Sequence, residues 1–194
     1  ERHSQTCRFI LSCNYSSKII EPIQSRCAVF RFRPLKESDI KKFLSFISSK
    51  ESLNVKEDGL DALVHVSQGD LRRAINSLQV AASLSKKIDS DAVYQAASIA
   101  RPEMVKSLIE TSIKGEFMKA RNILDELLIS QGLSGEDIIR QIHKSLSEIP
   151  MKDDLRVDLI DKTGEIEFRL VEGSNDRVQL EALLAYLSLM GKKK

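Results

Sequence analysis

Apolar residues recur every three or four positions through most of the chain after residue 34. That spacing places them on one face of an amphipathic helix, so this part of the chain is predicted to be helical. Glycine and proline residues divide the pattern into segments, because both residue types interrupt helices. The change in charge balance at Arg101-Pro102 predicts a boundary between two helical domains, residues 35–100 and residues 101–194.

Four short helices are predicted in the first of these domains. Asn54-x-x-Glu57 matches a capping box and predicts the start of the second helix. Gln68-Gly69 is expected to end that helix, and Asp70 is expected to begin the third. A short fourth helix is predicted over Asp91 to Ile99.

Five helices are predicted in the second domain. A cap at Ser134-x-x-Asp137 is expected to open the third of them. The last helix is apolar on nearly every side, so it is expected to be central or to lie in an interface. The five predicted ranges are Glu103–Ile113, Glu116–Ser130, Glu136–Ile149, Asp153–Val171 and Asp176–Met190.

The first 34 residues have a different pattern. Phe9 to Leu11 is a short apolar run followed by small and polar residues, and Ala28 to Phe32 is a second one. Apolar runs of this length predict buried strands. One strand pair does not form a stable sheet by itself, and the chain starts at Glu1 without a methionine. We therefore expect the sequence to be a fragment whose N-terminal part is missing.

Charge is distributed unevenly along the chain, although the formal net charge is only +2. Residues 1–34 carry a net charge of +4, and residues 101–190 carry a net charge of −5. The positive and negative charges of residues 35–100 cancel. Phosphate-bearing ligands are therefore expected near the basic N-terminal end. The acidic second domain is not expected to wrap nucleic acid.

The sequence excludes several kinds of site. It contains no G-x-x-x-x-G-K-[ST] loop, no G-x-G-x-x-G and no H-E-x-x-H, and its three histidines are scattered, so no metal site is predicted. The three cysteines form no C-x-x-C pair, which favours a reducing compartment. Neither a signal peptide nor an apolar run of the roughly 20 residues needed for a membrane span is present.

Three polar residues are candidates for chemistry. Asn14 follows the first predicted strand, where ligands bind in α/β sheets, but asparagine is also common in turns. Arg26 precedes the second predicted strand and is either a surface residue paired with Glu21 or a cation for phosphoryl oxygens. Arg72 lies in the first turn of a predicted helix, where a cation opposes the helix dipole. Arg72 therefore either pairs with Asp70 or has a function.

Three segments resemble the small subunits of replication factor C, the sliding-clamp loader of archaea and eukaryotes. They are Phe9-Ile-Leu-Ser-Cys-Asn-Tyr15, Ile19-Ile-Glu-Pro-Ile-Gln-Ser-Arg-Cys27 and Gly69-Asp-Leu-Arg-Arg-Ala-Ile-Asn-Ser-Leu-Gln79. Ser134 to Ile138, Gly164 to Arg169 and Glu172-Gly173 are also similar to the archaeal subunits. The resemblance covers the whole chain.

The resemblance implies a mainly α fold in three parts. Residues 1–34 would be the C-terminal remnant of an AAA+ RecA-like α/β domain, residues 35–100 a four-helix lid, and residues 101–194 a five-helix collar for oligomerisation. Asn14 then matches sensor 1, Arg26 the arginine finger that acts on the neighbouring subunit, and Arg72 sensor 2 of the lid. The family's phosphate loop and magnesium-binding acidic motif would precede Glu1, so this chain is not expected to bind ATP and Mg²⁺ tightly or to hydrolyse ATP alone.

The implied function is ATP-dependent loading of the PCNA clamp at primer–template DNA junctions. The implied partners are other clamp-loader subunits, small and large, in a cytoplasmic (archaeal) or nuclear (eukaryotic) setting. Two alternatives remain open at this point. One is a non-catalytic helical adaptor or oligomerisation module, and the other is the lid and C-terminal part of another AAA+ motor, such as a branch-migration helicase.

Overall fold

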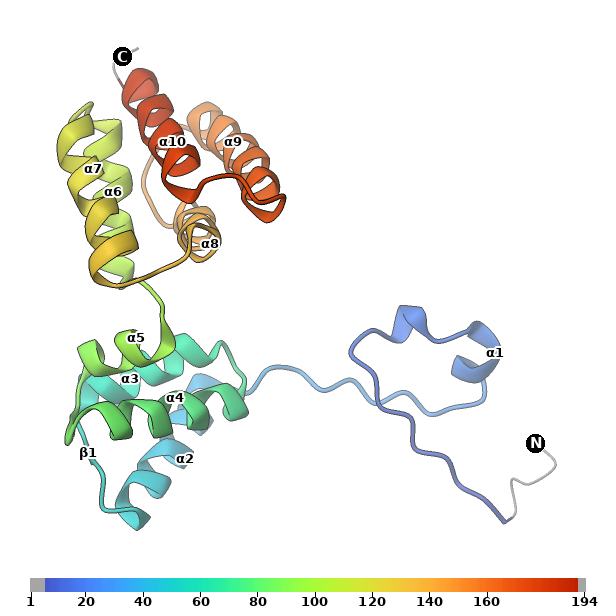
Figure 1. Cartoon of the computed structure of the whole chain (residues 1–194). Helices are drawn as coiled ribbons and strands as arrows, with labels where there is room; N and C mark the ends of the chain where they lie inside the picture. Colours follow the sequence, from blue (N-terminus) through green and yellow to red (C-terminus); the bar gives the residue numbers. More distant parts are fainter. Residues whose placement is uncertain (1–5, 192–194) are drawn as a thin grey trace. The chain divides into compact units, whose positions relative to one another are not determined.

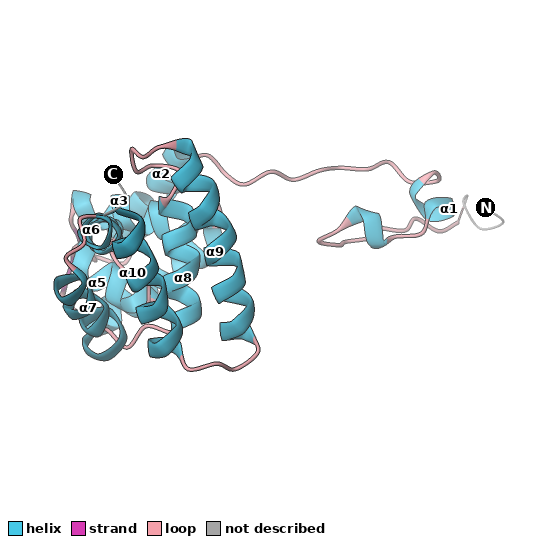
Figure 2. Ribbon diagram, turned by 90° about the horizontal axis from the view of Figure 1, so that it is seen from above, coloured by secondary structure: helices cyan, strands magenta, loops and turns pink. Residues whose placement is uncertain are grey.

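The computed structural model describes residues 6–191 of the chain. The chain divides into two units, residues 1–34 and residues 35–194, and each is described by itself. Helices are the dominant element of the larger unit, whereas the smaller unit is mostly loop (Figures 1 and 2). The prediction of a mainly α protein is therefore confirmed.

The first helical cluster of the larger unit contains the four predicted helices. They are α2 (Glu37–Lys50), α3 (Glu57–Ser67), α4 (Leu71–Leu84) and α5 (Ser90–Ala97). Their inward faces form one hydrophobic core, which includes Ile40, Leu44, Leu63, Leu78 and Val93.

Two short strands that the sequence pattern did not predict join this cluster. β1 (Asn54–Val55) and β2 (Lys87–Ile88) pair in parallel, with Asn54 opposite Lys87. The predicted capping box at Asn54 is therefore wrong: Asn54 belongs to a strand, and Lys56 precedes α3 without a side-chain cap. The predicted stop of α3 is correct, because Gln68 and Gly69 both have positive φ angles, at 51° and 86°.

The second helical cluster contains the five predicted helices of the C-terminal part. They are α6 (Pro102–Ile113), α7 (Phe117–Asp125), α8 (Gly135–Ser145), α9 (Asp153–Val171) and α10 (Asp176–Gly191). The second predicted helix, Glu116–Ser130, is α-helical only as far as Asp125. It continues as the π-helical turn η2 (Glu126–Ser130). The predicted cap of α8 is present, since Ser134 Oγ accepts the Asp137 N–H at 3.1 Å.

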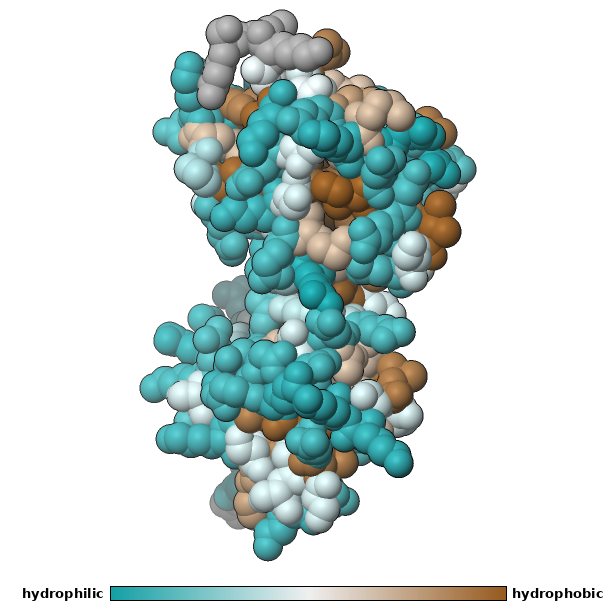
Figure 3. All heavy atoms as spheres, turned by 90° about the vertical axis from the view of Figure 1, so that its left-hand side faces the viewer, coloured by the Kyte–Doolittle hydropathy of each residue, from teal (hydrophilic) through white to brown (hydrophobic). Residues whose placement is uncertain are grey.

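Helix α10 is the centre of the second cluster, as its all-round apolar sequence predicted. It packs against α6, α7, α8 and α9, and Figure 1 shows it between α7 and α9. Its buried leucines join a core that also includes Leu108, Leu124, Ile138 and Ile166. On the face of the larger unit seen in Figure 3, apolar side chains appear in separate patches among hydrophilic ones.

The smaller unit contains no strand within its described residues 6–34, so the two predicted buried strands are wrong for this chain. Its helical elements are η1 (Ser16–Lys18) and α1 (Glu21–Gln24). Phe9 and Phe30 are each 81% exposed. The physical reason is that a strand needs a hydrogen-bonded neighbour, and residues 6–34 supply neither a paired edge nor a core.

Candidate functional site

The segment between Asn14 and Arg26 folds into a compact loop. Asn14 is exposed and lies in a bend directly before the η1 turn. Two backbone hydrogen bonds close that turn, from the Lys18 N–H to the Tyr15 carbonyl at 3.1 Å and from the Ile19 N–H to the Ser16 carbonyl at 3.0 Å. Asn14 therefore leads into a turn, which is the ordinary role of asparagine considered above.

Gln24, the last residue of α1, holds this loop closed. Its side-chain Nε2 donates to the Ser16 carbonyl at 2.9 Å and to the Ile19 carbonyl at 2.6 Å. The side-chain amide of glutamine carries two N–H donors, so one group can satisfy both acceptors. Gln24 carries no signal of this role in the sequence, because a hydrogen bond between residues eight positions apart around a turn produces no periodic pattern.

Arg26 lies in the turn that follows α1 and is exposed. Its Nη1 donates to the Pro22 carbonyl at 2.9 Å, and Ser25 Oγ donates to the same carbonyl at 3.2 Å. Pro22 is the second residue of α1 (Glu21–Gln24), and proline is favoured in the first turn of a helix because it lacks the backbone N–H that has no helical partner there. Arg26 therefore lies exposed in the turn after a short helix in which proline fixes one φ angle.

Arg72 is at the N-terminal end of α4, in the larger unit. Asp70 Oδ1 accepts the backbone N–H groups of Arg72 at 2.8 Å and Arg73 at 3.2 Å, so Asp70 is the N-cap of α4. The carboxylate complements the positive end of the helix dipole, which offsets the unfavourable arginine in the first turn. Within residues 6–191, no carboxylate forms an ion pair with the exposed Arg72 guanidinium.

The structure brings two of the three predicted residues into one unit. Asn14 and Arg26 flank the Gln24-closed loop in residues 1–34, whereas Arg72 belongs to the unit that starts at Leu35. The Leu35 N–H donates to the Gly69 carbonyl at 3.0 Å, so the larger unit begins beside the turn that precedes Arg72. Whether the three residues act together stays a prediction.

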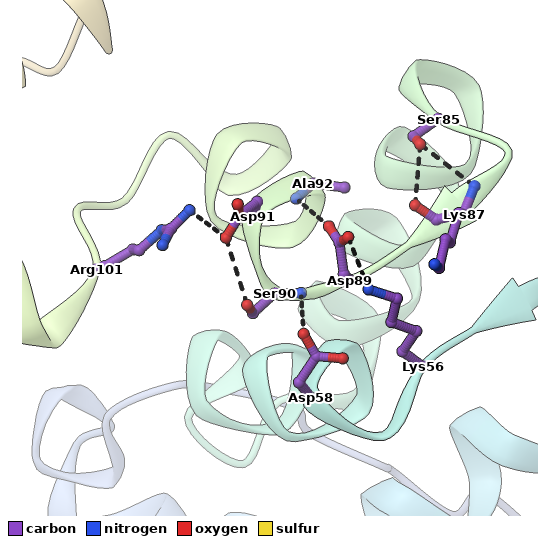
Figure 4. A network of polar contacts seen from close by, with 9 residues as sticks. All are labelled: Lys56, Asp58, Ser85, Lys87, Asp89, Ser90, Asp91, Ala92 and Arg101. Carbon is purple, nitrogen blue, oxygen red and sulfur yellow. Dashed lines mark hydrogen bonds and ion pairs between the residues drawn. The ribbon is translucent and has the colours of Figure 1, made fainter.

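A polar network near β2 has a structural role (Figure 4). Asp89 accepts the Ala92 N–H at 3.3 Å and pairs with Lys56 at 3.2 Å, and Asp58 accepts the Ser90 N–H at 3.2 Å. These contacts lower the pKa of Asp89, chiefly through the Ala92 N–H, and lower the pKa of Asp58, chiefly through the Ser90 N–H. The network therefore fastens the start of α5 to the start of α3.

Other features of the described residues give no further site of this kind. Two shallow hollows on the second helical cluster are lined by residues of η2 and the α9–α10 turn and by residues of α8 and α9. Asn14, Arg26 and Arg72 line neither of them. Residues 6–191 contain no cluster of three or more His, Cys, Asp or Glu placed to hold a metal ion, and no helix long and apolar enough to cross a membrane.

Two protein-family models match the two helical clusters. The model of the RCF1/5-like AAA+ ATPase lid domain matches residues 42–83, and the model of the replication factor C C-terminal domain matches residues 100–186. The chain is also similar over its whole length to the replication factor C small subunit of Archaeoglobus fulgidus, with 54% identity over 193 residues. Along its whole length the chain is therefore similar to a replication factor C small subunit, and each helical cluster matches a family model of the same group.

Other archaeal proteins show the same similarity. The replication factor C small subunit of Methanocella arvoryzae is 52% identical over 191 residues, which is 98% of this chain and 59% of the relative. That of Pyrococcus horikoshii is 55% identical over 194 residues, which is 100% of this chain and 23% of the relative. The match to the Archaeoglobus protein covers 100% of this chain and 60% of the relative, so the chain spans about 60% of the length of that replication factor C subunit.

Proposed function

We propose that this chain is the part of a clamp-loader small subunit that senses nucleotide and joins subunits. The complete gene product would use ATP to load the PCNA sliding clamp at primer–template DNA junctions, in the cytoplasm of an archaeal cell. The observation that carries this proposal is the identity of about half of all residues to replication factor C small subunits along the whole chain. The two family-model matches also support it, since the lid domain comes first along the chain and the C-terminal domain follows.

The exposed Arg26 and Arg72 fit a role in contacting the phosphate groups of a nucleotide. A guanidinium group is always charged and presents a planar fork of donors that matches phosphate oxygens. Arg26 would act as an arginine finger on the ATP of the adjacent subunit, Arg72 as sensor 2 from the lid, and Asn14 as sensor 1 by orienting the attacking water. ATP brings the phosphoryl group that is transferred; the phosphate loop and the Mg²⁺ ligands would come from residues outside this chain.

Exposed apolar side chains on the second helical cluster support a role in assembly. Val157 and Phe168 on α9 are 65% and 68% exposed, and Val178 and Leu189 on α10 are 62% and 64% exposed. A large exposed apolar surface is typical of a protein–protein contact. We therefore infer that this cluster is a collar that binds other clamp-loader subunits.

Replacement of Arg26 tests the proposed role in hydrolysis. Arg26→Ala in the complete, assembled gene product is expected to lower ATP turnover by about 10³-fold or more, because an arginine finger contributes rate enhancement of that order. ATP binding, measured by nucleotide titration, is expected to stay within a few fold of the wild type.

The control is Arg31→Ala, which removes another exposed arginine from the same unit. Equal turnover in wild type and the Arg26 variant would contradict the proposed role of Arg26.

A second, independent test is the gene sequence upstream of Glu1. A G-x-x-x-x-G-K-[ST] loop there supports the ATPase, whereas its absence favours a helical adaptor.

A further inference from the structure

The side chain of Gln24 connects the two ends of the loop that carry Asn14 and Arg26. Both of its hydrogen bonds run to carbonyls of the η1 turn, one to Ser16 and one to Ile19. Ser16 follows Asn14 by two residues, and Gln24 precedes Arg26 by two residues. The Gln24 amide therefore holds the η1 turn, which follows Asn14, against α1, the helix that precedes Arg26.

The contact matters because residues 6–34 have no buried core. No residue in the described range 6–34 is buried, so hydrophobic packing does not hold the loop in shape. Turn and helix hydrogen bonds act within each half of the loop, such as that from the Ser25 N–H to the Glu21 carbonyl at 2.9 Å. Gln24 is one of three half-buried residues in this range, together with Ser16 and Ile19, the residues whose carbonyls it binds.

Arg26 is oriented by the same short helix. Its Nη1 donates to the Pro22 carbonyl of α1, so the position of α1 sets the position of the guanidinium group. A displacement of the η1 turn would be transmitted through Gln24 to α1 and then to Arg26. The path consists of hydrogen bonds within one unit and needs no contact with the rest of the chain.

We propose that Gln24 is a positioning residue that couples Asn14, acting in the subunit's own ATP site, to Arg26, acting in the neighbour's site. The proposal rests on the proposed function, because it assigns Asn14 and Arg26 to two nucleotide sites. Its consequence is that hydrolysis or release of nucleotide in one site changes the placement of the arginine in the next site. Gln24 itself touches no substrate.

The test uses Gln24→Glu in the complete, assembled gene product. Glutamate has nearly the same shape but donates no hydrogen bond when ionised, and its charge repels the two carbonyl oxygens. ATP turnover is expected to fall by about 10- to 100-fold, because misplacing a catalytic group by about 1 Å costs on the order of 10²-fold in rate. The KM for ATP is expected to stay within about twofold, since Gln24 does not bind nucleotide.

Three companion variants make the result specific. Ser25→Ala removes a different side-chain hydrogen bond to the same helix and is expected to leave turnover near the wild type. Gln24→Lys keeps a donor at this position and is expected to recover much of the lost turnover. Arg26→Ala reports separately whether Arg26 is functional at all.

Amide hydrogen exchange gives a structural readout on the 194-residue chain itself. In Gln24→Glu, the amides of Lys18 and Ile19 are expected to exchange faster, because the η1 turn loses its support from α1. Normal turnover in Gln24→Glu, with turnover abolished in Arg26→Ala, would overturn the coupling and leave the proposed function intact. Normal turnover in Arg26→Ala would overturn the role of Arg26, and the coupling with it.

Discussion

At the scale of single residues, Glu181 on α10 shows how charge supports the second helical cluster. Its Oε1 accepts from Arg121 Nε of α7 at 2.8 Å and from Arg177 Nε at 3.0 Å. Arg177 also pairs with Asp125 at the end of α7. The two arginines, with Arg121 contributing most, lower the pKa of Glu181 below the ordinary value of 4.5.

This shift predicts a pH dependence of stability. A carboxyl group whose pKa is lowered by folding stabilises the folded state above its unfolded pKa and loses that contribution as the pH falls. Glu181→Gln is therefore expected to lower Tm by about 2 °C at pH 7, a small effect because the arginines are partly exposed. The difference in Tm from the wild type should shrink as the pH falls below about 4.5.

Thermal unfolding followed by circular dichroism between pH 3 and pH 8 measures this difference. Glu126→Gln is the matched control, because Glu126 is exposed and forms no ion pair with another described residue. A Tm difference that stays constant over the whole pH range would contradict the role of Glu181.

At the scale of elements, the starts of α8 and α10 stabilise each other. Asp176, the first residue of α10, accepts the Gly135 N–H at 2.6 Å through Oδ2. Gly135 begins α8 and is buried, and a β-carbon added there would lie 2.6 Å from the Asp176 Cγ. The contact therefore requires glycine at the first position of α8.

A pair of glycine substitutions tests this contact. Gly135→Ala is expected to lower the free energy of unfolding by about 1–3 kcal/mol, because the added methyl group displaces Asp176 and leaves a buried N–H without its acceptor. Gly164→Ala, in the middle of α9, has open space around the new β-carbon and is expected to raise the stability by about 0.5–1 kcal/mol.

Urea denaturation of both variants gives the two free energies. Equal stability of Gly135→Ala and the wild type would show that the helix starts do not depend on each other. Loss of stability in Gly164→Ala would show instead that the open side of α9 is occupied in solution.

At the scale of the whole molecule, the second helical cluster presents apolar surface on its outside as well as in its core. Along α9, Val157, Ile160, Phe168 and Val171 are exposed at helical spacing, with acidic residues Asp154, Asp158 and Asp161 beside them. The core of the same cluster is already filled by the opposite face of α9. This arrangement leaves the exposed stripe available for another subunit.

Phe168→Asp is expected to weaken self-association of the chain at least about tenfold, because it places a charge in the apolar stripe. Phe46→Asp is the matched control, since Phe46 is 56% exposed on α2 of the first cluster. Sedimentation velocity over a range of protein concentrations measures the association. A wild-type chain that remains a monomer at high concentration would contradict the role of this cluster in assembly.

The sequence by itself determined the helical part of this protein. The apolar periodicity after residue 34 located all nine helices from α2 to α10 within the described residues, and Asp70 and Ser134 marked two starts correctly. These predictions succeed because a helix satisfies its backbone hydrogen bonds within four residues, so its signal is local. The candidate residues Asn14, Arg26 and Arg72 also came from sequence, through residue type and resemblance.

Only the tertiary structure decided the features that depend on distant partners. Asn54 looked like a helix cap but pairs with Lys87, 33 residues away, in a parallel strand pair. Phe9 to Leu11 and Ala28 to Phe32 looked like strands but form none, because a strand exists only where a neighbour completes its hydrogen bonds. Gln24, which closes the loop between Asn14 and Arg26, was visible only once the chain had folded back on itself.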